Sequence, residues 1–161
     1  SFHHHPADTI PEKTLDNGAK VRVMMGQGFG LVSPVETFSE TLYYEIDLPD
    51  GASIVLPSVA ESGLYVVEGE VAIGEATSKL FEFSVLSEGS HTVTAVSPTG
   101  GRSRFAVIGG APLGERHIRW NFVSSRKDRI AQAAEQWRNG DFPTVPGDET
   151  EHIPLPKELI F

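Results

Sequence analysis

The 161-residue sequence contains no cysteine, and this absence excludes several kinds of chemistry at once. Without thiols the chain forms no disulfide bond, holds no Cys-ligated zinc and offers no thiol nucleophile. A reducing cytoplasm is compatible with this composition, and we expect the protein there. No apolar run approaches the ~18–20 residues that a membrane span requires. The sequence also starts without an initiator Met or a charged-then-apolar leader, so we expect Ser1 to be a cut end.

Basic residues are scarce overall but locally concentrated. Thirteen Lys and Arg against 22 Asp and Glu give a net charge of −9, which argues against direct nucleic-acid binding because that function requires a basic surface. The segment from Arg102 to Arg138, however, contains eight basic residues and only three acidic ones. Two interpretations stay open. The basic segment is solvated or docks on an acidic sheet, or it forms a patch for an anionic partner or ligand.

Short apolar segments separated by turn signals fill the first two thirds of the chain. The pattern predicts strands over residues 20–24, 41–48, 52–56, 80–86, 92–96 and 103–108, and two strands within 63–73 that form a hairpin around Glu68-Gly69. Turns recurring about every ten residues are typical of an antiparallel sandwich or barrel. Gly26, Gly28 and Gly30 lack the Lys-Ser/Thr ending and following helix of a phosphate-binding loop, so we interpret them as a bend or bulge.

One helix is predicted near the C-terminus, over about residues 125–139. Ser124 and Ser125 are N-cap candidates, and Asp128 supplies a weak form of the capping box. Asn139-Gly140 provides the C-terminal stop, since Gly accepts the left-handed conformation found there. One apolar stripe follows helical spacing and consists of Ile130, Ala133, Ala134 and Trp137. We expect this stripe to cover the β-structure.

Two extended segments flank the predicted barrel. Residues 1–19 read as an N-terminal arm with a turn at Asp16-Asn17-Gly18. The three histidines at positions 3–5 fit either a native linker or a tag remnant. Residues 141–161 are acidic and rich in proline, so we expect an ordered strap over the surface. Its apolar anchors would be Ile153, Leu155, Leu159, Ile160 and Phe161.

Several sequence blocks carry a family resemblance. GGAPLGERHIRWNFVSS, WRNGDFPTVPGDE and HIPLP resemble the C-terminal end of pirin-family proteins, which are two-domain cupins. RVMMGQGFGLVSPVETFSETLYYEIDLPDG and LYVVEGEVAIG resemble the start and middle of the same C-terminal cupin. The resemblance implies an all-β, cupin-type double-sheet jelly-roll barrel over residues 20–110. It also implies that residues 111–161, with one helix and an extended tail, pack on that barrel.

The resemblance also bears on metal binding. A cupin site typically combines two histidines one residue apart, a carboxylate and a third histidine from a later strand. The first pair would fall at residues 56–59, which contain no histidine. Glu61 lies nearby and His91 lies near the place of the later histidine, while His117 alternates with Ile118 in a strand-like segment. We therefore expect no metal and no cofactor in this chain, with His91, Glu61 and His117 as weak candidates only.

Two functions from different classes follow. In the first, the chain is a metal-free C-terminal cupin that serves as a structural and interaction module for a metal-binding N-terminal cupin, or self-associates when that partner is absent. In the second, it is a quercetin-type dioxygenase that holds iron or another divalent transition metal, or a cupin with a small-molecule pocket in the barrel mouth. In the pirin family the metal chemistry is assigned to the N-terminal cupin, which has no counterpart here.

Overall fold

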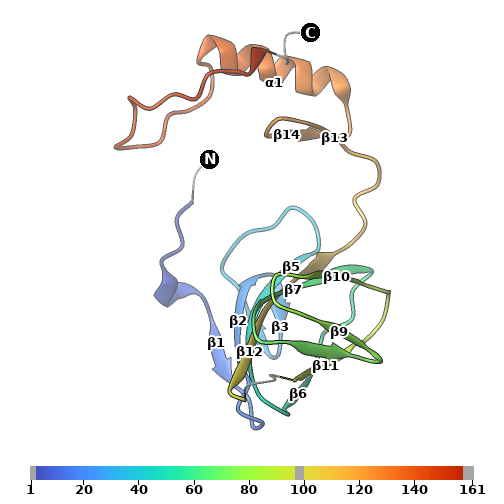
Figure 1. The fold of residues 1–161 in the computed structure, drawn as a ribbon. Coiled ribbons are helices and arrows are strands. Elements are labelled where there is room, and N and C mark those ends of the chain that lie inside the picture. The colour runs from blue at the N-terminus through green and yellow to red at the C-terminus, as the bar shows by residue number, and fades with distance from the viewer. Residues whose placement is uncertain (1–2, 97–99, 158–161) are drawn as a thin grey trace. The chain divides into compact units, whose positions relative to one another are not determined.

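The computed structural model describes residues 3–96 and 100–157. The chain divides into two compact units. The barrel unit is His5–Pro112, and the C-terminal unit is Leu113–Phe161 together with Ser1–His4 (Figure 1). That residues 111–161 pack on the barrel stays a prediction. Within the described residues, no helix is long and apolar enough to cross a membrane.

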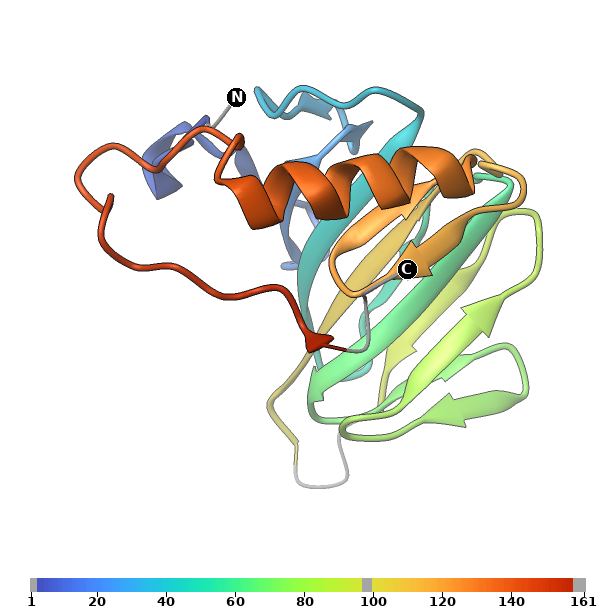
Figure 2. The same cartoon turned by 90° about the horizontal axis from the view of Figure 1, so that it is seen from above.

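Two antiparallel sheets build the barrel unit (Figures 1 and 2). The larger sheet has six strands in the order β1 (Glu12–Thr14), β2 (Lys20–Met25), β5 (Thr41–Pro49), β12 (Arg102–Gly110), β7 (Glu61–Glu68) and β10 (Phe83–Leu86). The smaller sheet has four, in the order β6 (Ser53–Val55), β11 (Thr92–Ala95), β8 (Val71–Ile73) and β9 (Ala76–Ser78). The short pair β3 (Gln27–Gly28) and β4 (Leu31–Val32) follows β2. This is the cupin-type jelly roll that the sequence predicts.

The core of the barrel unit follows from the alternation of side chains along the strands. In β5 every second residue is buried, and the same period holds in β12 from Ser103 to Val107. Ile54, Val71 and Val93 of the smaller sheet belong to the same buried cluster as these strands. The largest fully buried side chains of the larger sheet are Tyr44, Phe105, Ile46, Leu48 and Leu64. Burying each apolar side chain of this size contributes about 1.5–3 kcal/mol.

The predicted hairpin around Glu68-Gly69 is wrong. Strand β7 ends at Glu68 in the six-stranded sheet, whereas β8 begins at Val71 in the four-stranded sheet, so the two strands do not pair. Gly69 has a φ of 69°, and the Ser103 hydroxyl donates a hydrogen bond to the Glu70 carbonyl at 2.6 Å. The same Gly turn signal therefore marks a corner at which the chain crosses from one sheet to the other.

The N-terminal arm is partly built into the larger sheet. A short 3₁₀ turn, η1 (Ala7–Thr9), comes first. The three residues of β1 then pair antiparallel with β2 and form the edge strand of the six-stranded sheet. The predicted turn before β2 is confirmed, because the Gly18 amide donates to the Leu15 carbonyl at 2.9 Å with a Gly18 φ of 79°. From His5 onward the arm belongs to the barrel unit.

The C-terminal unit contains a hairpin and one helix. Strands β13 (His117–Arg119) and β14 (Phe122–Ser124) pair, and α1 (Lys127–Asn139) follows. The predicted N-cap is wrong. Arg126 occupies that position without a side-chain cap, because Ser124 bonds the Arg126 amide and Asp128 pairs with the Arg126 guanidinium. The predicted C-terminal stop is confirmed, since Gly140 is left-handed with a φ of 74°.

Aromatic rings gather between the hairpin and the helix. Trp120 and Trp137 meet edge to face with 5.3 Å between ring centroids, and Phe122 stacks on Phe142 at 6.1 Å. Trp120 sits in the hairpin turn with a φ of 53°, so the predicted alternation ends at Arg119. Both tryptophans therefore pack within this unit.

The tail contacts the helix through a backbone carbonyl and through the His152 ring, which stacks on Trp137 with 5.8 Å between ring centroids. The Trp137 indole N–H donates to the Ile153 carbonyl at 2.8 Å. Of the predicted anchors, Leu155 is half-buried and Ile153 is exposed, whereas Leu159, Ile160 and Phe161 lie outside the described residues.

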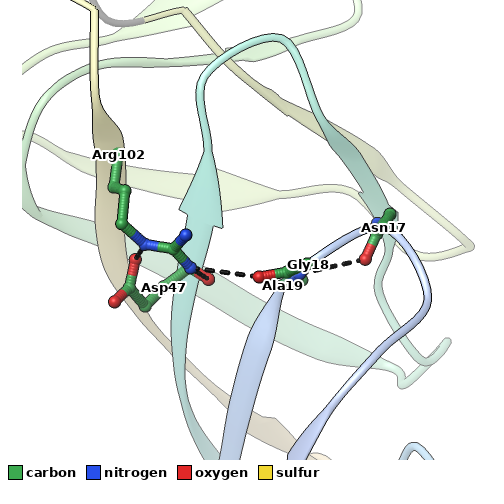
Figure 3. A network of polar contacts seen from close by, with 5 residues as sticks. All are labelled: Asn17, Gly18, Ala19, Asp47 and Arg102. Carbon is green, nitrogen blue, oxygen red and sulfur yellow. Dashed lines mark hydrogen bonds and ion pairs between the residues drawn. The ribbon is translucent and has the colours of Figure 1, made fainter.

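A cluster of polar contacts around Arg102 lies at one end of the barrel unit (Figure 3). The Arg102 guanidinium on β12 bonds the Asp47 carboxylate, the Asp47 carbonyl at 2.9 Å and the Gly18 carbonyl at 3.1 Å. Next to Gly18, the Asn17 side chain donates to the Ser53 carbonyl on β6 at 2.7 Å. The β1–β2 turn is thereby joined to both sheets.

This cluster gives the first testable prediction. Arg102→Lys keeps the charge but loses the planar fork that bonds three acceptors. We expect the free energy of unfolding in urea to fall by about 1 kcal/mol, since the pair is partly exposed. Arg104→Lys, on the same strand with its nearest carboxylate 3.9 Å away, should change it by less than about 0.5 kcal/mol. An equal fall in the free energy of unfolding in the two variants would contradict a stabilising role of the Arg102 hydrogen bonds.

Candidate functional site

A pocket of about 460 Å³ opens in the barrel unit. We call it the mouth pocket. One wall comes from Gly26 and Gln27 at β3, a second from the first residues of β5, and a third from Pro57, Ser58 and Val59. The third wall follows β6 and occupies the position predicted for the first histidine pair.

Tyr44 lies at the base of the mouth pocket. Its side chain is fully buried because β5 alternates, and its hydroxyl donates to the Gln27 carbonyl. The ring meets Phe29 edge to face at 5.5 Å. Burial raises the pKa of the Tyr44 phenol above its usual 10.0, and the negative charge of Glu40 raises it further. Tyr44 is therefore a neutral hydrogen-bonded phenol at physiological pH.

Gly28 makes this arrangement possible. A Cβ at position 28 would lie 2.7 Å from the Tyr44 hydroxyl oxygen, so only glycine lets the β3 backbone approach the phenol this closely. The prediction of a bend at the Gly-rich segment was therefore correct, and its physical reason is the ring beneath it.

The segment after β4 is fixed by Ser33. Its hydroxyl donates to the Met24 carbonyl at 2.7 Å and accepts from the Val35 amide at 3.2 Å. The Ser33 amide in turn donates to the Gly26 carbonyl at 2.9 Å. These bonds hold Val32, Ser33 and Val35 along the rim of the mouth pocket.

The three weak metal candidates do not come together at the pocket. His91 lies just before β11, and its Nε2 is 2.7 Å from the Ser87 carbonyl oxygen. Glu61 begins β7 and is exposed, and His117 belongs to the C-terminal unit. Within the described residues, no group of three or more His, Asp or Glu side chains is placed to hold a metal ion.

The donors of the mouth pocket therefore do not fit a transition metal. Its lining offers the hydroxyls of Ser33, Thr37, Thr41 and Ser58, the carboxylate of Glu40 and several valines. Divalent iron, copper or nickel prefers imidazole donors, and none of the lining residues is a histidine. Hydroxyls beside apolar walls suit a small neutral molecule instead.

Sequence reasoning did not identify Tyr44, Glu40 or Gly28 as pocket residues. The segment TLYYEIDL predicted a strand, and strict alternation within it could have marked Tyr44 as inward-facing. Nothing local in the sequence, however, indicates that Gly28 lies over that ring, because the two residues are 16 positions apart.

The buried phenol predicts a pH-dependent stability. Because the pKa of Tyr44 is higher in the folded than in the unfolded chain, its contribution is full below about pH 10 and is lost as the pH rises through the folded value. We expect the free energy of unfolding to fall more steeply from about pH 9.5 to 11 in the wild type than in Tyr44→Phe.

The matched control is Tyr65→Phe, which alters a partly exposed ring outside the pocket. This variant should keep the wild-type pH dependence. Urea titrations of the three proteins at several pH values give the free energy of unfolding as a function of pH. If this free energy falls as steeply with pH in Tyr44→Phe as in the wild type, the buried phenol is not its cause. Tyr44→Phe should also cost about 1 kcal/mol at neutral pH, since the Gln27 carbonyl loses its donor.

Comparisons with known proteins agree with this architecture. The family model of the pirin C-terminal cupin domain matches residues 43–143. A pirin-like protein of Caulobacter vibrioides is 34% identical over 158 residues, which cover 98% of this chain and 54% of that protein. Pirin of Homo sapiens is 34% identical over 140 residues, which cover 83% of this chain and 48% of that protein.

A solved structure shows the same fold. Quercetin 2,3-dioxygenase from Acinetobacter baumannii superimposes with a TM-score of 0.74 at 24% identity, over 87% of this chain and 50% of that one. The chain spans about half the length of these relatives. On the match to residues 43–143 and the 34% identity to pirin proteins, the chain belongs to the pirin family and contains its C-terminal cupin domain.

Proposed function

We propose that this chain is a non-catalytic cupin domain whose role is to pair with a second, metal-binding cupin, and that it pairs with its own copy when that partner is absent. The observation that carries the proposal is an apolar patch on the outer face of the six-stranded sheet. The donors of the mouth pocket support the non-catalytic part, because they do not fit a transition metal.

The outer apolar patch spans three adjacent strands and consists of Tyr65, Phe83, Val85 and Ile108. These side chains are between 37% and 82% exposed. Phe83 lies opposite Tyr65, and Val85 and Ile108 lie opposite Gly63 from either side. Residues directly opposite one another in a sheet share a face, so the four side chains form one continuous surface.

Gly63 lies within the patch, against the Phe83 ring. A Cβ at this position would lie 2.2 Å from the Phe83 ring, so the ring covers the backbone of the neighbouring strand. Contiguous exposed apolar surfaces of this kind are typical of protein interfaces.

Charged pairs border the patch on the β2 and β5 side. Glu45 lies 3.7 Å from Arg22 and 3.9 Å from Arg104, and Arg22 also pairs with Glu12 at 2.7 Å. An apolar centre with a polar rim is the usual anatomy of an interface. The border would orient the partner while the patch supplies the buried area.

A second cupin domain is the occupant that fits best. The relatives of this chain carry about as much sequence again as the match covers. In the pirin family that remainder is expected to include the N-terminal, metal-binding cupin. The proposal assigns the metal chemistry to that partner and the supporting surface to this chain.

The test is sedimentation velocity of the chain alone and mixed with the separately expressed remaining half of the Caulobacter vibrioides pirin-like protein. We expect the wild type to self-associate alone and to form a one-to-one complex in the mixture. Val85→Lys places a charge in the patch and should weaken both associations by roughly tenfold or more.

The control variant is Val55→Lys. Val55 is a 58% exposed valine on β6 of the other sheet, so it receives the same charge at a matched site outside the patch. Association should remain within about twofold of the wild type. A wild type that stays monomeric and does not bind the other half would overturn the proposal, as would a Val55→Lys loss equal to that of Val85→Lys.

The mouth pocket favours a second candidate function, binding of a small neutral molecule. Its hydroxyl and apolar lining and its volume of about 460 Å³ suit such a ligand. The Acinetobacter baumannii neighbour is named a quercetin 2,3-dioxygenase. Dioxygenase activity in this chain would require iron or another divalent transition metal held by residues other than those lining the mouth pocket.

A further inference from the structure

The C-terminal unit contains a pocket that the proposed pairing does not use. It measures about 340 Å³ and lies where the end of α1 meets the tail. Its aromatic lining consists of Trp137, Phe142 and His152, and its charged lining consists of Asp148 and Glu151. None of the described Lys and Arg residues lines it. We call it the tail pocket.

Backbone contacts give the tail pocket a defined shape. The left-handed Gly140 ends α1 and turns the chain into the tail. Further along the tail, the Asp148 amide donates to the Val145 carbonyl at 3.0 Å. The chain then returns to the helix, where the Trp137 indole N–H donates to the Ile153 carbonyl at 2.8 Å. The walls of the pocket are therefore held in place by hydrogen bonds within the C-terminal unit.

Three aromatic rings meet at the tail pocket. Trp137 packs against Phe142 with 5.5 Å between ring centroids, and His152 stacks on Trp137 with the ring planes 22° apart. Phe142 is still 40% exposed. The π faces of aromatic rings are electronegative and attract cations, and clusters of such rings recognise quaternary ammonium groups in particular. The aromatic lining therefore points to a cationic ligand independently of the carboxylates.

The two carboxylates of the tail pocket are not neutralised by the protein. Among the residues that the structure describes, neither the Asp148 nor the Glu151 carboxylate takes part in a hydrogen bond or an ion pair. The neighbouring Glu149 differs, because its Oε1 accepts a hydrogen bond from the Gly147 amide at 3.0 Å and its side chain does not line the pocket. The negative charge of Asp148 and Glu151 thus stays available to a cation in the pocket.

We propose that the tail pocket binds a small organic cation of the quaternary ammonium class, with its methyl groups against the aromatic rings and its charge beside Asp148 and Glu151. Val145 and Ile153 supply further apolar contacts for the methyl groups. The volume lies within the range of small-molecule sites. A calcium ion fits less well, because it takes six to eight oxygen ligands and the pocket is lined largely by aromatic and apolar side chains.

The test is a nuclear magnetic resonance titration of the ¹⁵N-labelled 161-residue chain with choline at low salt. The chain has two tryptophans and therefore two indole N–H signals. We expect the Trp137 signal to shift saturably and the Trp120 signal, from a ring that does not line the pocket, to shift less. The alcohol 3,3-dimethylbutan-1-ol has the shape of choline without its charge, and it should bind at least about tenfold more weakly.

Matched variants locate the site. Asp148→Asn and Glu151→Gln should each weaken choline binding by about threefold, and the double variant should weaken it by about tenfold. Glu149→Gln removes the same charge from a side chain outside the pocket and keeps an oxygen acceptor for the Gly147 amide. This control should change the affinity by less than about 1.5-fold. All three positions are exposed, which keeps folding out of the comparison.

Four results would overturn the proposal. Choline could fail to shift the Trp137 signal saturably. The neutral alcohol could bind as tightly as choline, which would make the pocket an apolar site. Glu149→Gln could weaken binding as much as Glu151→Gln, which would indicate a general charge effect. Calcium chloride could shift the Trp137 signal at lower concentrations than choline, which would replace the organic cation with a metal ion.

Discussion

Strand β12 hydrogen-bonds to β5 along its whole length, from Arg102 opposite Pro49 to Gly110 opposite Thr41, and to β7 on its other side. The rest of the barrel unit depends on this pairing. It fixes which residues of the three strands face inward, since a shift of one residue would turn every side chain to the opposite face. At one end, the Arg102 cluster also joins β12 to β5 and to the turn before β2.

The same register creates the two surfaces of the barrel unit on which the proposed functions rest. Inward alternation on β5 buries Tyr44 beneath the mouth pocket, and outward alternation on β7, β10 and β12 produces the outer apolar patch. The mouth pocket has hydroxyl and apolar walls, and one of these walls occupies the position predicted for the first histidine pair. This lining is compatible with the proposal that the domain pairs with a second cupin that carries the metal chemistry.

Local signals predicted some elements well and others poorly, for physical reasons. Gly140 ends the helix because its left-handed conformation is a property of one residue, and the sequence therefore predicts it. The N-cap was misplaced because Asp128 pairs with Arg126 instead of completing a capping box. The corner at Gly69 was taken for a hairpin, since a turn residue does not say which sheet the next strand joins.

Tyr44 was missed because its role depends on contacts between distant segments. The packing of residues 111–161 on the barrel and the absence of a metal stay predictions.

The metal content of the tag-free chain, after incubation with Fe(II), Cu(II) or Ni(II) and removal of unbound ions, decides whether this cupin holds a metal. Inductively coupled plasma mass spectrometry gives the ratio of metal to chain. Because the mouth pocket lacks imidazole donors, the account predicts well below about 0.1 ion per chain for each metal. A ratio near one for any of them, lost when His91 is replaced by Ala, would contradict the account and assign the chemistry to this cupin.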